Sequence, residues 1–112
     1  MTKVAIPILN GHTALQFENS NQFLIYDLSN SDTVVLSRHL ERSGNNHPEL
    51  IPQELAEQNV KIVLARWIHK DIAKMLSDFK ISLFTGVSKQ EPDELIEDYI
   101  EGHLETNDKM CY

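Results

Sequence analysis

Histidines in three polar stretches of the chain could bind a metal ion. Imidazole nitrogen suits copper, iron or zinc, so His12, His47 and His69 are candidate ligands. No two histidines have a close ligand spacing such as His-x3-His, so exposed loop histidines without a ligand remain the alternative. His39 and His103 are assigned no role, because one ends a predicted strand and the other follows the last predicted helix.

An arginine and a tryptophan stand together in Arg66-Trp-Ile-His69, just before a predicted helix. A guanidinium beside a helix N-terminus can bind an anion, because the first N–H groups of the helix point the same way. A small anion such as a carboxylate would suit such a site, and Trp67 would stack on the ligand or on Arg66. Alternatively, Arg66 pairs with a nearby carboxylate, and Trp67 covers the sheet edge or contacts a protein.

Strands and helices alternate in a way that would position these residues. Apolar, β-branched runs between turn residues indicate strands, and apolar residues at helical spacing indicate helices. The expected order is βββαβαβα, an α/β fold with a mixed five-stranded sheet and flanking helices. The predicted strands are Lys3–Leu9, Gln22–Leu28, Thr33–His39, Lys61–Ala65 and Ile81–Phe84, and the predicted helices are Ile51–Gln58, Lys70–Phe79 and Glu91–Glu101.

Two loops of this arrangement are the expected ligand-binding surface. In open α/β sheets, ligands bind at the carboxyl ends of the parallel strands. The long loop 10–21 and the turn 66–70 both follow such ends, so they should lie along one rim of the sheet. The candidate ligand contacts on these loops are Asn10, His12, Arg66, Trp67 and His69.

Apolar motifs spread over the chain share a recognisable order. They are Lys3-Val-Ala-Ile-Pro7, Phe17, Phe23-Leu-Ile-Tyr-Asp27, Leu55-Ala-Glu-Gln-Asn-Val-Lys-Ile-Val-Leu-Ala65, and the positions Ala73, Leu76, Ile81, Phe84 and Gly86. In these motifs the chain resembles the dinitrogenase iron–molybdenum cofactor biosynthesis family over roughly residues 3–104. The resemblance implies a ribonuclease-H-like fold. It also implies binding or carrying of a metal-containing cofactor or its precursor, such as a molybdenum-, iron- or copper-containing cluster.

The chain departs from the family at the loops that would face the ligand. The family commonly has Ser-Pro-His-Phe-Gly in the first loop, where this chain has Ala14-Leu-Gln-Phe-Glu18. Its Gly-Gly-Ile-Gly turn is replaced by Arg66-Trp-Ile-His69. By position, the resemblance makes Gln16 and Phe17 further candidate cofactor contacts. His47 becomes a candidate metal ligand, because it lies near the position of a histidine-containing loop in the family.

These departures leave two functions open. Glycines would let a large ligand approach the backbone, whereas arginine, tryptophan and histidine side chains fill that space. A smaller or anionic ligand, or a protein partner, is therefore favoured over a bulky metal–sulfur cluster. The leading hypothesis is a carrier of a metal-containing cofactor or its precursor. The alternative is a protein-interaction or regulatory module that has lost the cofactor site.

Catalytic patterns are weak in this chain. Two-metal nucleases need several carboxylates that converge on sheet strands, but Lys3–Leu9 carries none and Asp27 stands alone at a strand end. The sequence has no GxSxG, P-loop or GxGxxG motif, and its single cysteine, Cys111, lies in a polar tail. We therefore expect a non-enzymatic protein.

Composition narrows the class of protein and its partners. The 112 residues predict one domain over residues 1–104 and a flexible tail over 105–112. A net charge of −7 without a basic cluster disfavours nucleic acid. The lone cysteine and the lack of a long apolar run predict a cytoplasmic protein without membrane contact. The expected partners are a metal cofactor or cofactor-biosynthesis proteins, and the expected state is a monomer or weak dimer.

Overall fold

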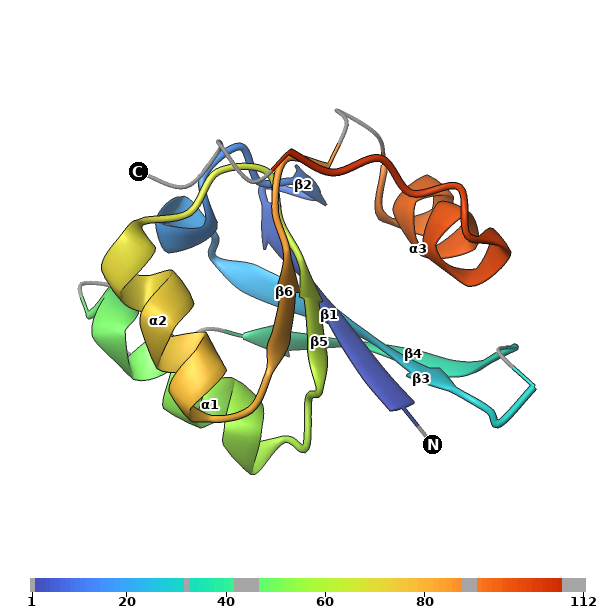
Figure 1. The fold of residues 1–112 in the computed structure, drawn as a ribbon, viewed down its shortest axis with the longest axis horizontal. Helices are drawn as coiled ribbons and strands as arrows, with labels where there is room; N and C mark the ends of the chain where they lie inside the picture. The colour runs from blue at the N-terminus through green and yellow to red at the C-terminus, as the bar shows by residue number, and fades with distance from the viewer. Residues whose placement is uncertain (1, 32, 42–46, 88–90, 108–112) are drawn as a thin grey trace.

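One mixed β-sheet forms the middle layer of the molecule, with α1 and α2 on one face and α3 on the other (Figure 1). The computed structural model describes residues 2–31, 33–41, 47–87 and 91–107. The predicted α/β class and βββαβαβα order are confirmed, with one additional short strand. The elements are β1 (Thr2–Leu9), β2 (His12–Thr13), the 3-10 helix η1 (Phe17–Asn19), β3 (Gln22–Leu28), β4 (Val34–Glu41), the 3-10 helix η2 (Pro48–Leu50), α1 (Ile51–Glu57), β5 (Ile62–Leu64), α2 (Lys70–Asp78), β6 (Ser82–Phe84) and α3 (Pro92–Glu101).

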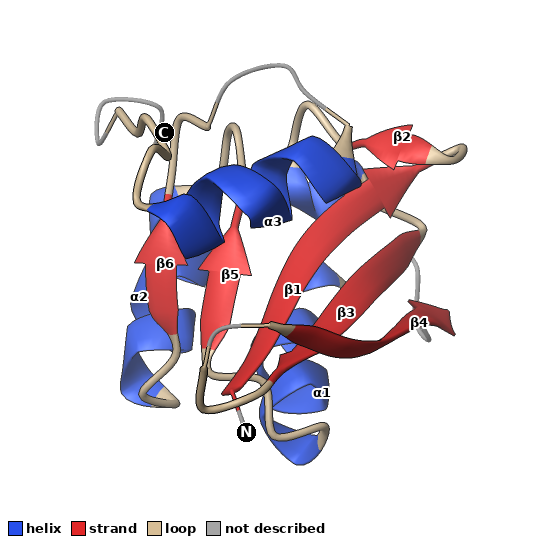
Figure 2. Cartoon of the chain, turned by 90° about the vertical axis from the view of Figure 1, so that its right-hand side faces the viewer, coloured by secondary structure: helices blue, strands red, loops and turns tan. Residues whose placement is uncertain are grey.

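The strands are arranged in the order β4-β3-β1-β5-β6, with the short β2 paired to β1 (Figure 2). The first half of the chain supplies antiparallel pairs, β1 with β3 and β3 with β4. The second half adds parallel pairs, β1 with β5 and β5 with β6, because a helix returns the chain between successive strands. The carboxyl ends of β1, β5 and β6 therefore point to one rim of the sheet.

Two apolar cores lie on the two faces of this sheet. Alternate side chains of a strand point to opposite faces, and helices cover both faces of β1, so its central residues are buried on both sides. The core beneath α1 and α2 includes Ala5, Phe23, Ile25, Leu55 and Leu76. The core beneath α3 includes Val4, Ile6, Tyr26, Leu95 and Ile96. No helix in the described parts of the chain is long and apolar enough to cross a lipid bilayer.

The predicted loop 10–21 contains more structure than the sequence analysis expected. Asn10 and Gly11 have φ angles of 53° and 88°, which are typical of a type I′ hairpin turn, and this turn joins β1 to β2. A 3-10 helix, η1, follows before β3 begins. The prediction of one long loop was wrong here, because Asn10-Gly11 is a sequence typical of a two-residue hairpin turn.

The chain after α3 is held against the end of β6. The N–H of Asn107 donates to the carbonyl of Thr85 at 2.8 Å, and the Thr85 hydroxyl donates to the Asn107 carbonyl at 3.3 Å. Gly86 has a φ of 71°, and a Cβ at this position would lie 2.5 Å from main-chain atoms of Asn107. The part of the predicted flexible tail that the structure describes, residues 105–107, thus ends in this contact; residues 108–112 lie outside the described chain.

Candidate functional site

The two loops predicted to share a rim are hydrogen-bonded to each other. Gln16 and Trp67 form an isolated parallel β-bridge. The N–H of Phe17 donates to the Trp67 carbonyl at 2.8 Å, and the N–H of Trp67 donates to the Leu15 carbonyl at 3.0 Å. The segment before η1 therefore extends the sheet beside the end of β5, and it brings residues 15–18 against residues 66–69.

Glu18 and His69 join these loops at the start of α2. A carboxylate oxygen of Glu18 accepts a hydrogen bond from the main-chain N–H of His69. His69 is the N-cap of α2, and its Nδ1 atom accepts from the N–H of Asp71 at 3.1 Å. Main-chain donors at a helix N-terminus are the groups that would otherwise bind an anion. Here two of them are bound by side chains of the protein itself.

Arg66 lies between β5 and this helix terminus and provides a further donor. Its carbonyl accepts from the N–H of Gly86 at 2.9 Å, which fixes the backbone beside the end of β6. Its Nε atom is buried and has no hydrogen-bond partner within the described chain. Buried donors are normally hydrogen-bonded, so this guanidinium nitrogen lacks an acceptor, which a bound ligand would have to bring to it. A single permanent positive charge makes an anionic acceptor the best match.

The remaining first-loop candidates take different positions. The Gln16 side chain accepts from Asn19 at 2.7 Å, so it lies at the loop junction. Phe17 is fully buried and packs against the Phe23 ring, with 5.4 Å between centroids; its side chain belongs to the core and presents no surface to a ligand. Asn10 is exposed on the hairpin turn and accepts from Asn21 at 3.4 Å.

Two of the candidate histidines do not join this junction through their hydrogen bonds. His12 Nδ1 lies 3.0 Å from a carboxylate oxygen of Glu91, the residue that precedes α3, and both side chains are exposed. His47 is exposed before η2 and lies 3.2 Å from Glu49. No group of three or more His, Cys, Asp or Glu side chains that could hold a metal ion occurs in the described residues. Metal binding by His47 stays a prediction.

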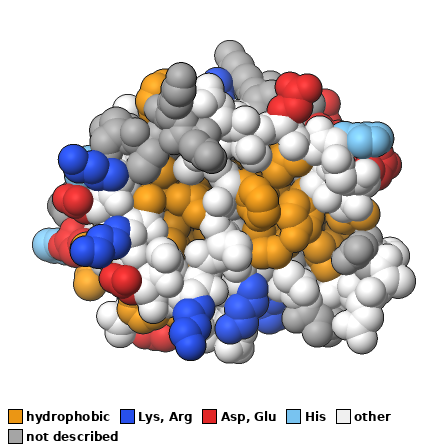
Figure 3. Space-filling model, in the orientation of Figure 1, with side chains coloured by type: hydrophobic (Ala, Val, Ile, Leu, Met, Phe, Trp, Pro, Cys, Tyr) orange, Lys and Arg blue, Asp and Glu red, His pale blue; other side chains and the backbone are white. Residues whose placement is uncertain are grey.

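A separate pocket of about 240 Å³ lies between β6 and the end of α3. Apolar side chains gather on both sides of β6 on this face of the molecule (Figure 3). Phe84 and Tyr99 both line the pocket, and their rings contact each other edge to face with centroids 5.9 Å apart. Its lining contains neither Arg66 nor the η1 loop, so the pocket is distinct from the junction described above.

Sequence reasoning assigned a contact to neither Glu18 nor Glu91, although Glu18 lay at the end of the candidate loop. Glu18 had a signal, because it stands where the family commonly has glycine and one residue beyond the candidate contact Phe17. Glu91 had none, because it is 79 positions from His12 in sequence and its contact depends on the packing of α3 against the sheet.

The sequence of this chain matches the family described as dinitrogenase iron-molybdenum cofactor over residues 1–102. The chain belongs to this family. The resemblance inferred from the apolar motifs is therefore confirmed, and it extends over nearly the whole described structure. No curated protein sequence matches the chain.

Solved structures of similar proteins share the family's fold. PH0822 is 23% identical, with a TM-score of 0.87 and 97% of each chain covered. The mj0327 protein of Methanocaldococcus jannaschii is 21% identical, with a TM-score of 0.73 and coverage of 95% of this chain and 94% of that one. The apo orange protein of Desulfovibrio gigas is 11% identical, with a TM-score of 0.74 and coverage of 96% and 94%. At these identities the likeness concerns the fold alone.

Proposed function

We propose that this family member is a non-enzymatic carrier of a small anionic, metal-containing precursor of a cofactor. The observation that carries the proposal is the buried Nε atom of Arg66, which has no acceptor among the described residues. Family membership supplies the metal-containing class of ligand. A molybdate- or thiomolybdate-like anion offers the oxygen or sulfur acceptors that a guanidinium binds.

The residues around Arg66 favour a small cargo over a preassembled cluster. A large cluster would need to approach the main chain where the family commonly has glycine. This chain has Glu18, Arg66, Trp67 and His69 at those positions. The His69 N–H and the Asp71 N–H are both bound by side chains. Arg66 thus provides the principal donor for a ligand in this proposal, and one guanidinium suits one small anion.

Calorimetric titration with molybdate and with tetrathiomolybdate tests this function. Removing a charged donor by Arg66→Gln should weaken binding about 10- to 100-fold, because hydrogen bonds to charged groups contribute about 1.5–3 kcal/mol. Arg38→Gln is the matched control, since Arg38 is also half-buried but bonds Gln58 on a different part of the sheet. Equal affinities of the wild type and both variants, or no binding to the wild type, would remove the proposal.

Glu18 should act as a competitor of the anion in the same assay. Its carboxylate is a negative charge at the start of α2, and a charge at close range in water-like surroundings costs an anion about 1 kcal/mol. Glu18→Gln should therefore tighten binding about fivefold while it keeps a side chain able to accept from His69. Unchanged or weaker binding would show that the anion does not sit near Glu18.

The second candidate function is a protein-interaction or regulatory module. It is favoured by Leu15, an apolar residue that is 52% exposed on the loop hydrogen-bonded to Trp67. Protein purified from its native host distinguishes the two functions. Coloured or molybdenum-containing material supports the carrier. Colourless, metal-free material that co-purifies with one defined protein, and loses it on Leu15→Asp, supports the module.

A further inference from the structure

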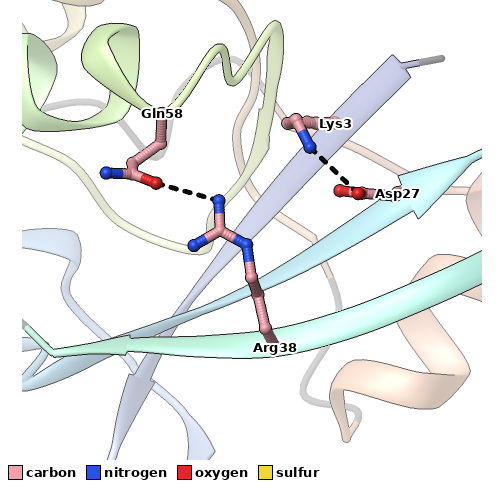
Figure 4. Close-up of polar contacts among 4 residues, drawn as sticks. All are labelled: Lys3, Asp27, Arg38 and Gln58. Carbon is pink, nitrogen blue, oxygen red and sulfur yellow. Dashed lines mark hydrogen bonds and ion pairs between the residues drawn. The ribbon is translucent and has the colours of Figure 1, made fainter.

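Buried side-chain atoms that lack a hydrogen-bond partner are few in the described chain, and two of them are donors on one rim of the sheet. The unpartnered atoms are Oγ1 of Thr13, Oδ1 of Asp27 and Nε of Arg66. The Asp27 carboxylate is engaged through its other oxygen, which lies 2.9 Å from Lys3 Nζ near the start of β1 (Figure 4). Thr13 and Arg66 lie at the other end of the sheet, beside the ends of β1 and β5. A buried hydroxyl or guanidinium nitrogen normally has a partner, so this pair requires an explanation.

Thr13 and Arg66 lean towards the same face of the sheet, the one that α3 covers. Thr13 is paired with Ile8 across β2 and β1, and Ile8 belongs to the core beneath α3. Directly paired residues of antiparallel strands share a face. At the end of β5, Leu64 belongs to the same core, whereas Ala65 belongs to the core beneath α1 and α2. Because side chains alternate along an extended chain, Arg66 turns back towards α3.

The register of the junction between the two loops sets the spacing of these donors. Gln16 is bridged to Trp67 in parallel. The residues before them, Leu15 and Arg66, are therefore neighbours, and Thr13 stands two positions before Leu15. With strands about 4.8 Å apart and a rise of about 3.3 Å per residue, the Cα atoms of Thr13 and Arg66 are about 8 Å apart. An arginine side chain and one small anion can span this gap.

The carboxylates at the start of α3, which adjoin this face, are engaged with other groups. Glu91 lies 3.0 Å from His12 Nδ1, and both side chains are exposed. Asp93 accepts a hydrogen bond from the Tyr26 hydroxyl. Among the described residues, no carboxylate forms an ion pair with Arg66. The charge of Arg66 is thus not neutralised by a carboxylate of the described chain.

We propose that Thr13 and Arg66 together bind one oxygen-bearing anion, with the Thr13 hydroxyl donating to one of its oxygens and Arg66 Nε to another. This inference rests on the proposed carrier function and narrows its cargo. A hydroxyl forms short, strong hydrogen bonds to anionic oxygen, whereas sulfur is a weak acceptor. The site should therefore prefer a fully oxygenated tetrahedral anion, such as molybdate, to the corresponding thioanion.

Thr13→Val distinguishes a ligand-binding hydroxyl from a structural one before any ligand is added. Valine has nearly the shape of threonine, so the variant removes a buried hydroxyl that has no partner in the described chain. In the ligand-free protein, Tm should stay level or rise by up to about 4 °C. Thr85→Val is the control, because the buried Thr85 hydroxyl donates to the Asn107 carbonyl, and its Tm should fall by about 4 °C. A similar fall for Thr13→Val would overturn the inference.

Calorimetric titration with molybdate and with tetrathiomolybdate tests the binding itself, and the wild type should bind molybdate more tightly. Thr13→Val should weaken molybdate binding at least about tenfold but tetrathiomolybdate binding less than about threefold. Thr13→Ser keeps the hydroxyl and should stay within about threefold of the wild type for both anions.

The outcomes separate this inference from the carrier function. If Arg66→Gln weakens molybdate binding and Thr13→Val does not, the inference is overturned while the carrier function stands. Tighter binding of tetrathiomolybdate than of molybdate, or equal losses for both anions in Thr13→Val, would overturn the preference for oxygen. If the wild type binds neither anion, the carrier function fails and this inference fails with it.

Discussion

Replacing Gly86 by alanine should destabilise the protein, because the added methyl group would be too close to Asn107. Gly102 has a similar backbone conformation but no such close neighbour. Gly86 and Gly102 have φ angles of 71° and 76°, so alanine is strained at both positions, by about 1 kcal/mol. A Cβ at Gly102 meets nothing within 4 Å, whereas one at Gly86 would lie 2.5 Å from main-chain atoms of Asn107. The difference between the two variants therefore isolates the contact.

The size of the effect follows from the bonds that Asn107 would lose. To admit the methyl group, Asn107 must move and release both of its hydrogen bonds with Thr85. At about 1 kcal/mol each, these add about 2 kcal/mol to the backbone strain. Gly86→Ala should thus cost about 3 kcal/mol and Gly102→Ala about 1 kcal/mol. For a domain of this size, the difference corresponds to roughly 8 °C in Tm.

Urea unfolding followed by fluorescence of Trp67, the only tryptophan, measures these free energies directly. A chain that ends at Thr106 provides the decisive background, because it lacks Asn107. Truncation alone should cost about 2 kcal/mol, and Gly86→Ala should then cost only about 1 kcal/mol more, the same as Gly102→Ala. If Gly86→Ala costs equally much in the full and truncated chains, the attribution to Asn107 is refuted.

Three further predictions concern polar contacts of different exposure. The Asp27 carboxylate is 8% exposed and lies 2.9 Å from Lys3 Nζ (Figure 4). Lys3→Met leaves this carboxylate without its cation and should destabilise the protein by about 2–3 kcal/mol. The double variant Lys3→Met, Asp27→Leu should recover most of this loss in urea unfolding. Burial and the hydrogen bond to Asp93 raise the pKa of Tyr26. Above about pH 10 the unfolded chain therefore ionises before the folded one, and stability falls as pH rises. Tyr26→Phe should be less stable than the wild type at neutral pH but lose less stability between about pH 9 and 11; parallel curves of stability against pH would contradict this. His12→Ala should change stability by less than about 0.5 kcal/mol, because His12 and Glu91 are both exposed, and a larger thermal shift would show that this contact positions α3.

The fold was largely predictable because local patterns and packing agree along most of this chain. The bounds of β3 match the prediction for Gln22–Leu28, where apolar residues meet turn residues at both ends. The β4 strand runs two residues further than the predicted Thr33–His39, because Glu41 pairs with Gln22 across the hairpin. Such extensions depend on a partner strand and cannot be read from one segment alone.

The candidate site was predictable at the level of the backbone but not of the side chains. The crossover rule correctly placed Gln16 and Trp67 on one rim, and their β-bridge confirms that placement. The reach of Glu18 to His69 and of His12 to Glu91 depends on side-chain packing between elements 51 and 79 positions apart. The burial of Phe17 in the core could not be predicted, because an aromatic residue in a polar stretch has the same sequence signal whether it faces a ligand or the core.

The departures from the family pattern act together on one set of donors. Where the family commonly has glycine, main-chain N–H groups at the start of α2 would be open to a ligand. In this chain Glu18 accepts from the N–H of residue 69, and the side chain introduced at residue 69 accepts from the N–H of Asp71. The same turn introduces Arg66, whose Nε has no acceptor in the described chain. Main-chain donors are thus replaced by one side-chain donor. A guanidinium keeps its charge whereas an N–H group is neutral, so under the proposed carrier function the exchange should favour small, fully ionised anions.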